Sequence, residues 1–116
     1  MWTKVCPISD LPLGASHGCS VDGAYLGIFH TADGLFAIDN SCPHQEGDLH
    51  QGRVSQGVVY CPLHHWRFRL CDGVSDVGSH YDLMCYRVKL EDGFVWVDVD
   101  SGTQADPDRE DPFCED

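Results

Sequence analysis

Two Cys-His pairs are the residues of this chain whose types and spacing could perform chemistry. Cys42 and His44 form a C-x-H pair, and Cys61 and His64 form a C-x2-H pair after residues 45–60. Two thiolates and two imidazoles can ligate a zinc ion or an iron-sulfur cluster. A single thiolate beside one imidazole can instead act as a nucleophile with its base.

Three interpretations of these four residues compete. A structural zinc site normally pairs Cys with Cys and His with His, whereas both pairs here are mixed. A catalytic Cys-His dyad needs one activated thiolate and one base, which leaves the second pair unexplained. In a mixed-ligand iron-sulfur cluster, one iron takes two thiolates and the other takes two imidazoles. The cluster uses all four residues, while the zinc and dyad alternatives remain open.

The two pairs closely resemble the ligand motif of the Rieske 2Fe-2S family. C-P-H-x4-L is followed by C-P-x-H-x-W-x-F, and the resemblance in strand pattern and motif extends over about residues 2–100. It implies a 2Fe-2S cluster with two cysteines on one iron and two histidines on the other. The ligands that it implies are Cys42, Cys61, His44 and His64.

The resemblance also implies what the cluster does. Two ferric ions, two sulfides and two thiolates sum to zero charge, so an electron is accepted more readily than with four thiolates, at about -150 to +300 mV. We expect a one-electron carrier that is not catalytic alone. Leu49 and Leu63 are expected to shield the cluster. Trp66 and Phe68 should pack beneath it, and because they replace the hydroxyl donors of respiratory members, we predict a low potential.

Two branches of the family fit a chain of this size. The runs LGIFHTADGLFAIDN and WRFRLCDG resemble the small subunit of the assimilatory NAD(P)H-dependent nitrite reductase (NirD), which reduces nitrite to ammonia in nitrate assimilation. The alternative is a soluble Rieske ferredoxin that feeds a ring-hydroxylating dioxygenase. The expected partner is a redox protein, either the large siroheme and flavin subunit or a dioxygenase and its reductase. A cluster-based redox sensor and a zinc-binding interaction module are less favoured.

The elements that would position the two pairs are β-strands. Asp-Gly turn signals in VDGAYLGIFH, TADGLFAID and LEDGFVWVDVD each adjoin a β-rich run, which is typical of hairpins. Apolar residues alternate with polar ones in YRVKL and in the run that holds Val95, Val97 and Val99, so Tyr86, Val88 and Leu90 should face the interior. The expected strands are Val5–Cys6, 19–21, 24–30, 35–39, 57–61, 66–70, 86–90 and 95–99, and no helix is predicted.

These strands predict an all-β fold. The resemblance implies a Rieske-type antiparallel β-sandwich with a small cluster-binding subdomain made of two loops, at about residues 40–50 and 61–73. The Rieske domain would span residues 1–100. Residues 101–116 are acidic and nearly free of apolar side chains, so we expect a disordered tail.

Length, charge and cysteine content narrow the class of protein. The 116 residues suffice for one domain but not for a cofactor domain plus a substrate domain. The net charge of -12 argues against nucleic acid and membrane surfaces as partners. The sequence has neither an apolar run of about 18 residues nor a secretory signal, so we expect a cytoplasmic protein. Seven cysteines, an odd number, favour metal binding over a disulfide framework.

The remaining histidines and cysteines receive no ligand role. Four histidines without ligand-like spacing are expected at the surface, namely His17, His30, His50 and His80. The other cysteines are interpreted as ordinary small side chains, and Cys71, close behind the second loop, is the one most open to oxidation.

Overall fold

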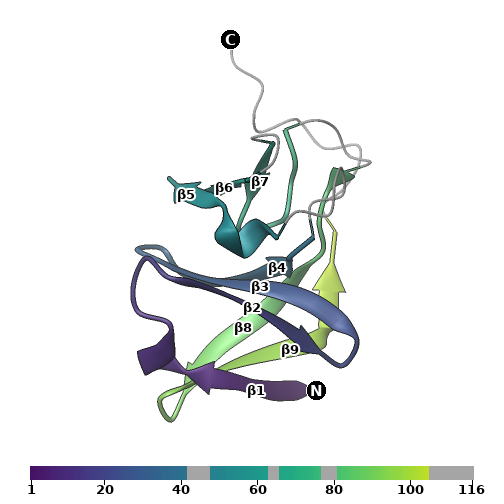
Figure 1. The fold of residues 1–116 in the computed structure, drawn as a ribbon. Helices are drawn as coiled ribbons and strands as arrows, with labels where there is room; N and C mark the ends of the chain where they lie inside the picture. The colour runs from purple at the N-terminus through teal and green to yellow at the C-terminus, as the bar shows by residue number, and fades with distance from the viewer. Residues whose placement is uncertain (42–47, 63–65, 77–80, 105–116) are drawn as a thin grey trace.

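The computed structural model describes residues 1–41, 48–62, 66–76 and 81–104, and the two ends of this region lie in different parts of the molecule (Figure 1). The secondary structure is almost entirely β, which confirms the predicted fold class. The elements are β1 (Trp2–Pro7), the 3-10 helix η1 (Ile8–Asp10), β2 (Ser16–Val21), β3 (Ala24–Thr31), β4 (Gly34–Asp39), the 3-10 helix η2 (Leu49–Gln51), β5 (Arg53–Ser55), β6 (Val58–Tyr60), β7 (Arg67–Arg69), β8 (Cys85–Glu91) and β9 (Phe94–Thr103).

Two antiparallel sheets make up the fold. Six strands form the large sheet in the order β1-β9-β8-β4-β3-β2, and β5-β6-β7 form a small sheet that is inserted between β4 and β8. Only two register pairs join β4 to β8, Ala37 with Tyr86 and Ile38 with Cys85. The large sheet bends at this junction, so that β2, β3 and β4 lie over β1, β8 and β9, and the small sheet lies above β4 (Figure 1).

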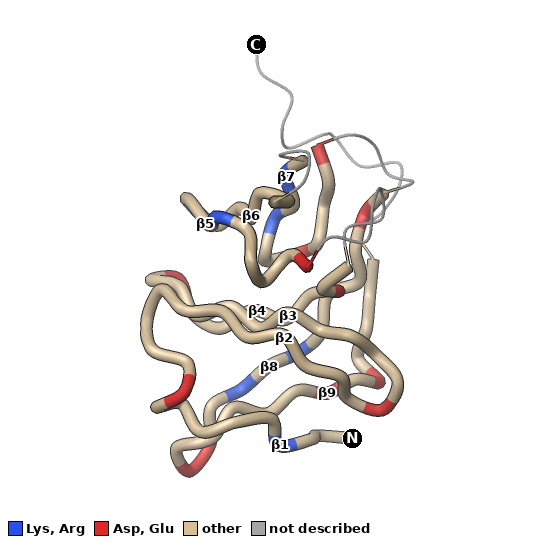
Figure 2. Tube along the Cα trace, in the orientation of Figure 1, with Lys and Arg blue, Asp and Glu red and all other residues tan. Residues whose placement is uncertain are grey.

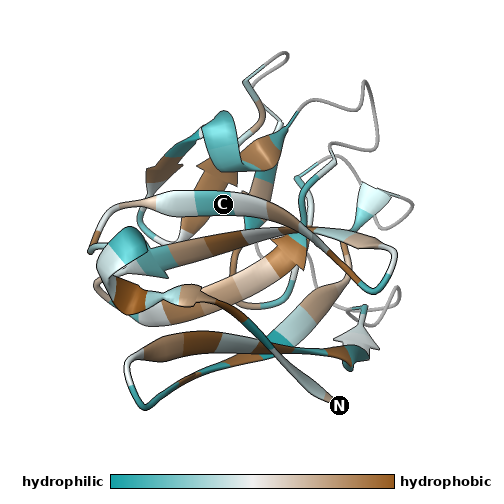
Figure 3. Ribbon diagram, turned by 60° about the horizontal axis from the view of Figure 1, so that its bottom comes forward, coloured by the Kyte–Doolittle hydropathy of each residue, from teal (hydrophilic) through white to brown (hydrophobic). Residues whose placement is uncertain are grey.

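The strands β3 and β4 are buried on both faces. Because successive side chains of a strand point to opposite faces, Ile28 and Ala37 belong to one hydrophobic core and Phe29 and Ile38 belong to another. The first, here called the sheet core, fills the bent large sheet. The second, here called the subdomain core, joins the large sheet to the small one. Figure 3 shows apolar residues along the strands and hydrophilic ones at the connecting turns.

Tight turns of one kind close three of the hairpins. Asp22-Gly23, Gln56-Gly57 and Asp92-Gly93 each have positive φ at both residues, at 48° and 86°, 54° and 78°, and 54° and 81°. That conformation matches the twist of the strands on either side and favours glycine in the second position. Two of these turns were predicted from Asp-Gly. In the β3–β4 hairpin, Thr31 pairs with Gly34, so the turn there is Ala32-Asp33 and the glycine already belongs to the strand.

The observed strands differ from the predicted ones mainly at their ends. β1, β2 and β8 are longer than expected, β9 continues to Thr103 past the expected boundary at residue 100, and β5 was not predicted. Leu90 was predicted to face the interior, and this was wrong. Its side chain is 53% exposed because it lies one residue before the end of β8, beside the turn to β9.

Charge is distributed differently over strands and turns. All the lysines and arginines of the described residues lie in strands, whereas acidic residues gather at the turns (Figure 2). The basic residues are Lys4, Arg53, Arg67, Arg69, Arg87 and Lys89. No helix in the described ranges is long and apolar enough to cross a membrane.

Candidate cluster site

Both predicted cluster-binding loops are closed at their bases by backbone pairing. Ser41 and Asp48 form an isolated antiparallel bridge across the first loop. The Cys61 amide donates a hydrogen bond of 2.8 Å to the Trp66 carbonyl across the second loop. The structure therefore holds the residues on either side of 42–47 and of 63–65, and these two ranges are called the first and the second loop from here on. The predicted ligands Cys42, His44 and His64 and the predicted shielding residue Leu63 lie outside the described residues.

Cys61 is the one predicted ligand whose side chain is described. It directly follows β6, it is fully buried, and it is a free thiol. It packs in the subdomain core with Leu49, which lies just after the first loop and is also fully buried. The bases of both loops thus meet in one water-excluding core. A buried, unpaired cysteine at the junction of two closed loops fits a cluster that draws one thiolate from each loop.

The two aromatic residues that were predicted to pack beneath the cluster lie at this junction. Phe68 is fully buried, pairs with Val59 in the small sheet and contributes to the subdomain core. Trp66 is partly buried against the same core, and its ring meets that of Tyr81 edge to face, with the centroids 5.0 Å apart. Both positions are packed by aromatic rings, and a phenylalanine ring has no hydrogen-bond donor.

The segment that follows β7 is tied back to the first residue of that strand and to residues 82–83. Asp76 accepts hydrogen bonds from the Arg67 amide at 3.0 Å and from Arg67 Nε at 2.9 Å. The buried Asp82 accepts one from the Ser75 amide at 2.9 Å, and the Leu83 amide donates to the Gly73 carbonyl at 2.8 Å. These contacts fix the described part of the segment after β7, and they hold Arg67, two residues after the second loop.

Sequence reasoning missed the residues that hold the first loop. Asn40, which is fully buried, and His50 lie on either side of this loop and are joined by two hydrogen bonds. His50 was expected at the surface, as were His17 and His30, but all three are only partly exposed. His30 has its own partner, since its Nδ1 lies 2.8 Å from the Leu11 carbonyl oxygen. His80 lies outside the described residues.

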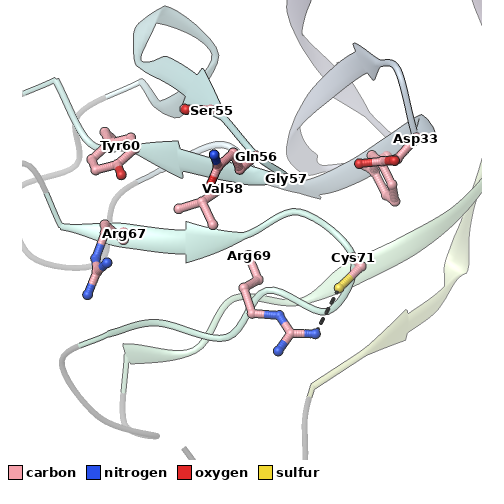
Figure 4. Close-up of a pocket in the computed structure, with 10 residues that line it drawn as sticks. Asp33, Ser55, Gln56, Gly57, Val58, Tyr60, Arg67, Arg69 and Cys71 are labelled. Carbon is pink, nitrogen blue, oxygen red and sulfur yellow. Dashed lines mark hydrogen bonds between the residues drawn. The ribbon is translucent and has the colours of Figure 1, made fainter. Parts of the chain in front are cut away.

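The outer face of the small sheet borders a groove of about 570 Å³. Arg67 and Arg69 both line this groove, and their side chains extend from the same side of β7 (Figure 4). Asp76 neutralises the first, and Arg69 Nη2 lies 3.4 Å from Asp72 Oδ2 and 3.3 Å from Cys71 Sγ. Both arginines on this face are therefore paired with a carboxylate, and Asp33 adds a further acid to the lining of the groove. Within the described ranges, no group of three His, Cys, Asp or Glu side chains could hold a metal ion.

Comparisons with known proteins agree with this geometry. The sequence model of the Rieske-like [2Fe-2S] domain matches residues 1–98. The ferredoxin component of the naphthalene 1,2-dioxygenase system of Pseudomonas putida is 28% identical over 99 residues, which cover 84% of this chain and 95% of that protein.

Two solved structures have the same fold. The E. coli protein NirD has a TM-score of 0.74 and 29% identity, over 84% of this chain and 94% of that one. A chain in the complex of reduced oxygenase and oxidized ferredoxin of carbazole 1,9a-dioxygenase has a TM-score of 0.72 and 29% identity, over 83% and 91%.

Proposed function

The chain belongs to the Rieske-like [2Fe-2S] family, and we propose that it transfers single electrons between redox proteins through a cluster held by its two Cys-His loops. The observation that carries the proposal is the position of Cys61, a buried free thiol where the bases of both loops meet. When bound, a cluster of this kind accepts and returns one electron. The proposed ligands are Cys42, His44, Cys61 and His64.

The described residues serve this function by fixing the loops and excluding water. The Ser41–Asp48 bridge and the Cys61–Trp66 hydrogen bond hold the loop ends. Leu49 and Phe68, both fully buried in the same core as Cys61, keep water from the base of the site. A rigid and dry setting reduces the structural change that must accompany a change of charge.

We propose the large subunit of an NAD(P)H-dependent nitrite reductase as the partner, with this chain as the small subunit. The support is the likeness to the E. coli protein NirD over nearly the whole of both chains. In that setting the chain would serve the reduction of nitrite to ammonia. A second candidate is a ferredoxin for a ring-hydroxylating dioxygenase, which is favoured by the likeness to the naphthalene 1,2-dioxygenase component.

The ligand assignment is tested by iron content and by the spectrum of the purified protein. Cys61→Ser and His64→Ala should each abolish the visible absorption and the low-average-g resonance of the reduced cluster. The matched control is Cys71→Ser, because Cys71 is an exposed thiol after the second loop. Retention of a normal spectrum by Cys61→Ser would contradict the assignment. A colourless wild-type protein with bound zinc would establish the zinc alternative.

The partner is tested by purifying the tagged chain from its native host with whatever it binds. Siroheme and flavin bands in the visible spectrum of the purified complex would support the nitrite reductase. An oxygenase without siroheme would instead establish the ferredoxin role. If the complex forms and His64→Ala leaves nitrite reduction unchanged, the cluster supports the assembly without carrying its electrons.

A further inference from the structure

We propose that Asn40 and His50 are a positioning pair that anchors the first cluster-binding loop to the large sheet, and that the anchor requires the neutral form of His50. The inference rests on the proposed role of residues 42–47 as a ligand loop. Asn40 lies two residues before Cys42, and His50 lies two residues after Asp48. The pair therefore joins the chain just before this loop to the chain just after it.

Three hydrogen bonds span the base of the loop. The His50 amide donates to Asn40 Oδ1 at 2.7 Å, Asn40 Nδ2 lies 2.8 Å from His50 Nδ1, and the Leu49 amide donates to the Asn40 carbonyl at 2.7 Å. Because Asn40 Oδ1 must be the atom that accepts the amide, Nδ2 is a donor, and His50 Nδ1 must accept. An imidazole whose Nδ1 accepts carries its proton on Nε2 and is neutral.

Asn40 and His50 pack against β2 and β3, where glycines leave space for their side chains. The Ser16 hydroxyl donates to the His50 carbonyl, which ties the 3-10 helix η2 to β2. A Cβ at Gly18 would lie 2.6 Å from His50 Nδ1, and one at Gly27 would lie 2.8 Å from Asn40 Oδ1. Two neighbouring strands thus lack side chains at the places where Asn40 and His50 lie, and larger residues there would displace the pair.

The described residues around the ring offer no new partner to a protonated His50. Ser16 and Gly18 of β2 bring no charge to it, and the residue that follows β4 is Asn40 itself. Asp48 flanks it, but Asp48 shares a hydrogen bond with Tyr25 of β3, and partial burial followed by that bond raises the pKa of Tyr25. Among the described residues, no carboxylate forms a hydrogen bond or ion pair with His50. Protonation therefore turns the accepting Nδ1 into a second donor that faces Asn40 Nδ2, and the anchor opens.

The experiment follows cluster loss, measured as bleaching of the visible absorbance, at several pH values between about 5.5 and 8, the span in which histidine side chains in general change charge. At pH 8, His50→Ala should lose the cluster about fivefold faster than wild type, because one partly buried hydrogen bond is lost. His50→Asn keeps an acceptor near the position of Nδ1 and does not titrate, so it should restore the wild-type rate at pH 8. Wild type should bleach faster than His50→Asn as the pH falls.

Asn40→Asp gives the sharpest outcome because its carboxylate can accept a hydrogen bond from Nδ1 of a charged His50. In this variant, acidification should slow cluster loss relative to His50→Asn, the reverse of wild type. His17→Ala is the matched control, since its side chain points to the opposite face of β2 from Ser16. Rates in His50→Ala and Asn40→Asp that equal the His17→Ala rate at every pH would overturn the inference.

A second measurement separates the anchor from the ligand assignment. Amide hydrogen exchange of Leu49 and His50 in the protein as purified should be faster in His50→Ala than in His17→Ala. Equal protection in the two variants would overturn the positioning role. If the purified wild type holds no iron and His50→Ala still exchanges faster than His17→Ala, the anchor is established and the proposed ligands are refuted.

Discussion

At the scale of single residues, the side chains that surround Cys61 determine how readily the cluster is reduced. Phe68 is fully buried beside Cys61, and Trp66 packs against the same core, so neither position offers a hydroxyl hydrogen bond to a sulfur. Because such bonds stabilise the more negative reduced cluster, we expect a midpoint near the low end of the Rieske range, about -150 mV.

A redox titration followed by circular dichroism measures this midpoint. Phe68→Tyr adds a hydroxyl next to Cys61 and should raise it, whereas Tyr60→Phe, on the opposite face of the small sheet, should not. A wild-type midpoint above about +100 mV, in the upper half of the range, would refute the prediction.

A second residue-scale prediction concerns Tyr86, where the large sheet bends. Its hydroxyl donates to Asp39 Oδ1 at 2.8 Å, and burial, followed by this hydrogen bond, raises the pKa of Tyr86 above its ordinary value. Above about pH 10, the unfolded chain releases the tyrosine proton while the folded chain keeps it. Stability from this group is thus complete below pH 10 and is lost as the pH rises through the raised pKa.

Urea unfolding between about pH 8 and 11, on both sides of the ordinary tyrosine pKa, measures the effect. Tyr86→Phe should lower the free energy of unfolding by about 1 kcal/mol at pH 8 through the lost hydrogen bond. Above pH 10, the free energy of unfolding of Tyr86→Phe should also decline less steeply than that of wild type or of Tyr60→Phe. Parallel declines in all three proteins would show that the Tyr86 proton is not linked to folding.

Among the elements, the close approach of Gly52, the residue that ends η2, to the end of β6 positions the two loops relative to each other. A Cβ at Gly52 would overlap the backbone carbonyl of Tyr60, one residue before Cys61, and backbone atoms cannot move aside cheaply. Gly52→Ala should therefore destabilise the protein by about 3 kcal/mol. Gly57→Ala is the control, because its positive φ costs about 1 to 2 kcal/mol while nothing crowds its Cβ. Equal losses in urea unfolding would mean that the Gly52 contact relaxes.

What the sequence could predict depends on whether the signal is local. Alternation in β9 and the turns Asp22-Gly23 and Asp92-Gly93 are local, and they were predicted correctly. The three-residue strand β5 is too short to show a period, and its turn is Gln56-Gly57, which is a weaker signal than Asp-Gly.

In the candidate site, too, only the features with a local signal in the sequence could be predicted. The spacing of Cys42, His44, Cys61 and His64 identifies the family, and the match over residues 1–98 confirms it. The pairing of Asn40 with His50 could not be predicted, because it arises only when η2 folds against β2 and β3. The absent side chains of Gly18 and Gly27 are meaningful only once those strands are placed beside the pair.

In the whole molecule, the two hydrophobic cores have different sources of stability. The sheet core is enclosed by strands of six to ten residues, whereas the small sheet over the subdomain core has strands of only three. Such short strands are marginal without further support, and the subdomain core contains Cys61 and the bases of both loops. A cluster that bridges the loops would bind the subdomain only in its folded form, and it would therefore stabilise that form.

We therefore expect removal of the iron to open the small subdomain and leave the large sheet folded. After chelation under reducing conditions, amide hydrogen exchange should accelerate in β5, β6 and β7, while β8 and β9 keep their protection. The control is the apo form of a Cys71→Ser variant, since Cys71 is exposed and lies outside the subdomain core. Loss of protection in β9 as fast as in β6 would mean that the two cores unfold as one unit. The dependence on the cluster would then extend through the doubly buried strands β3 and β4, which contribute side chains to both cores.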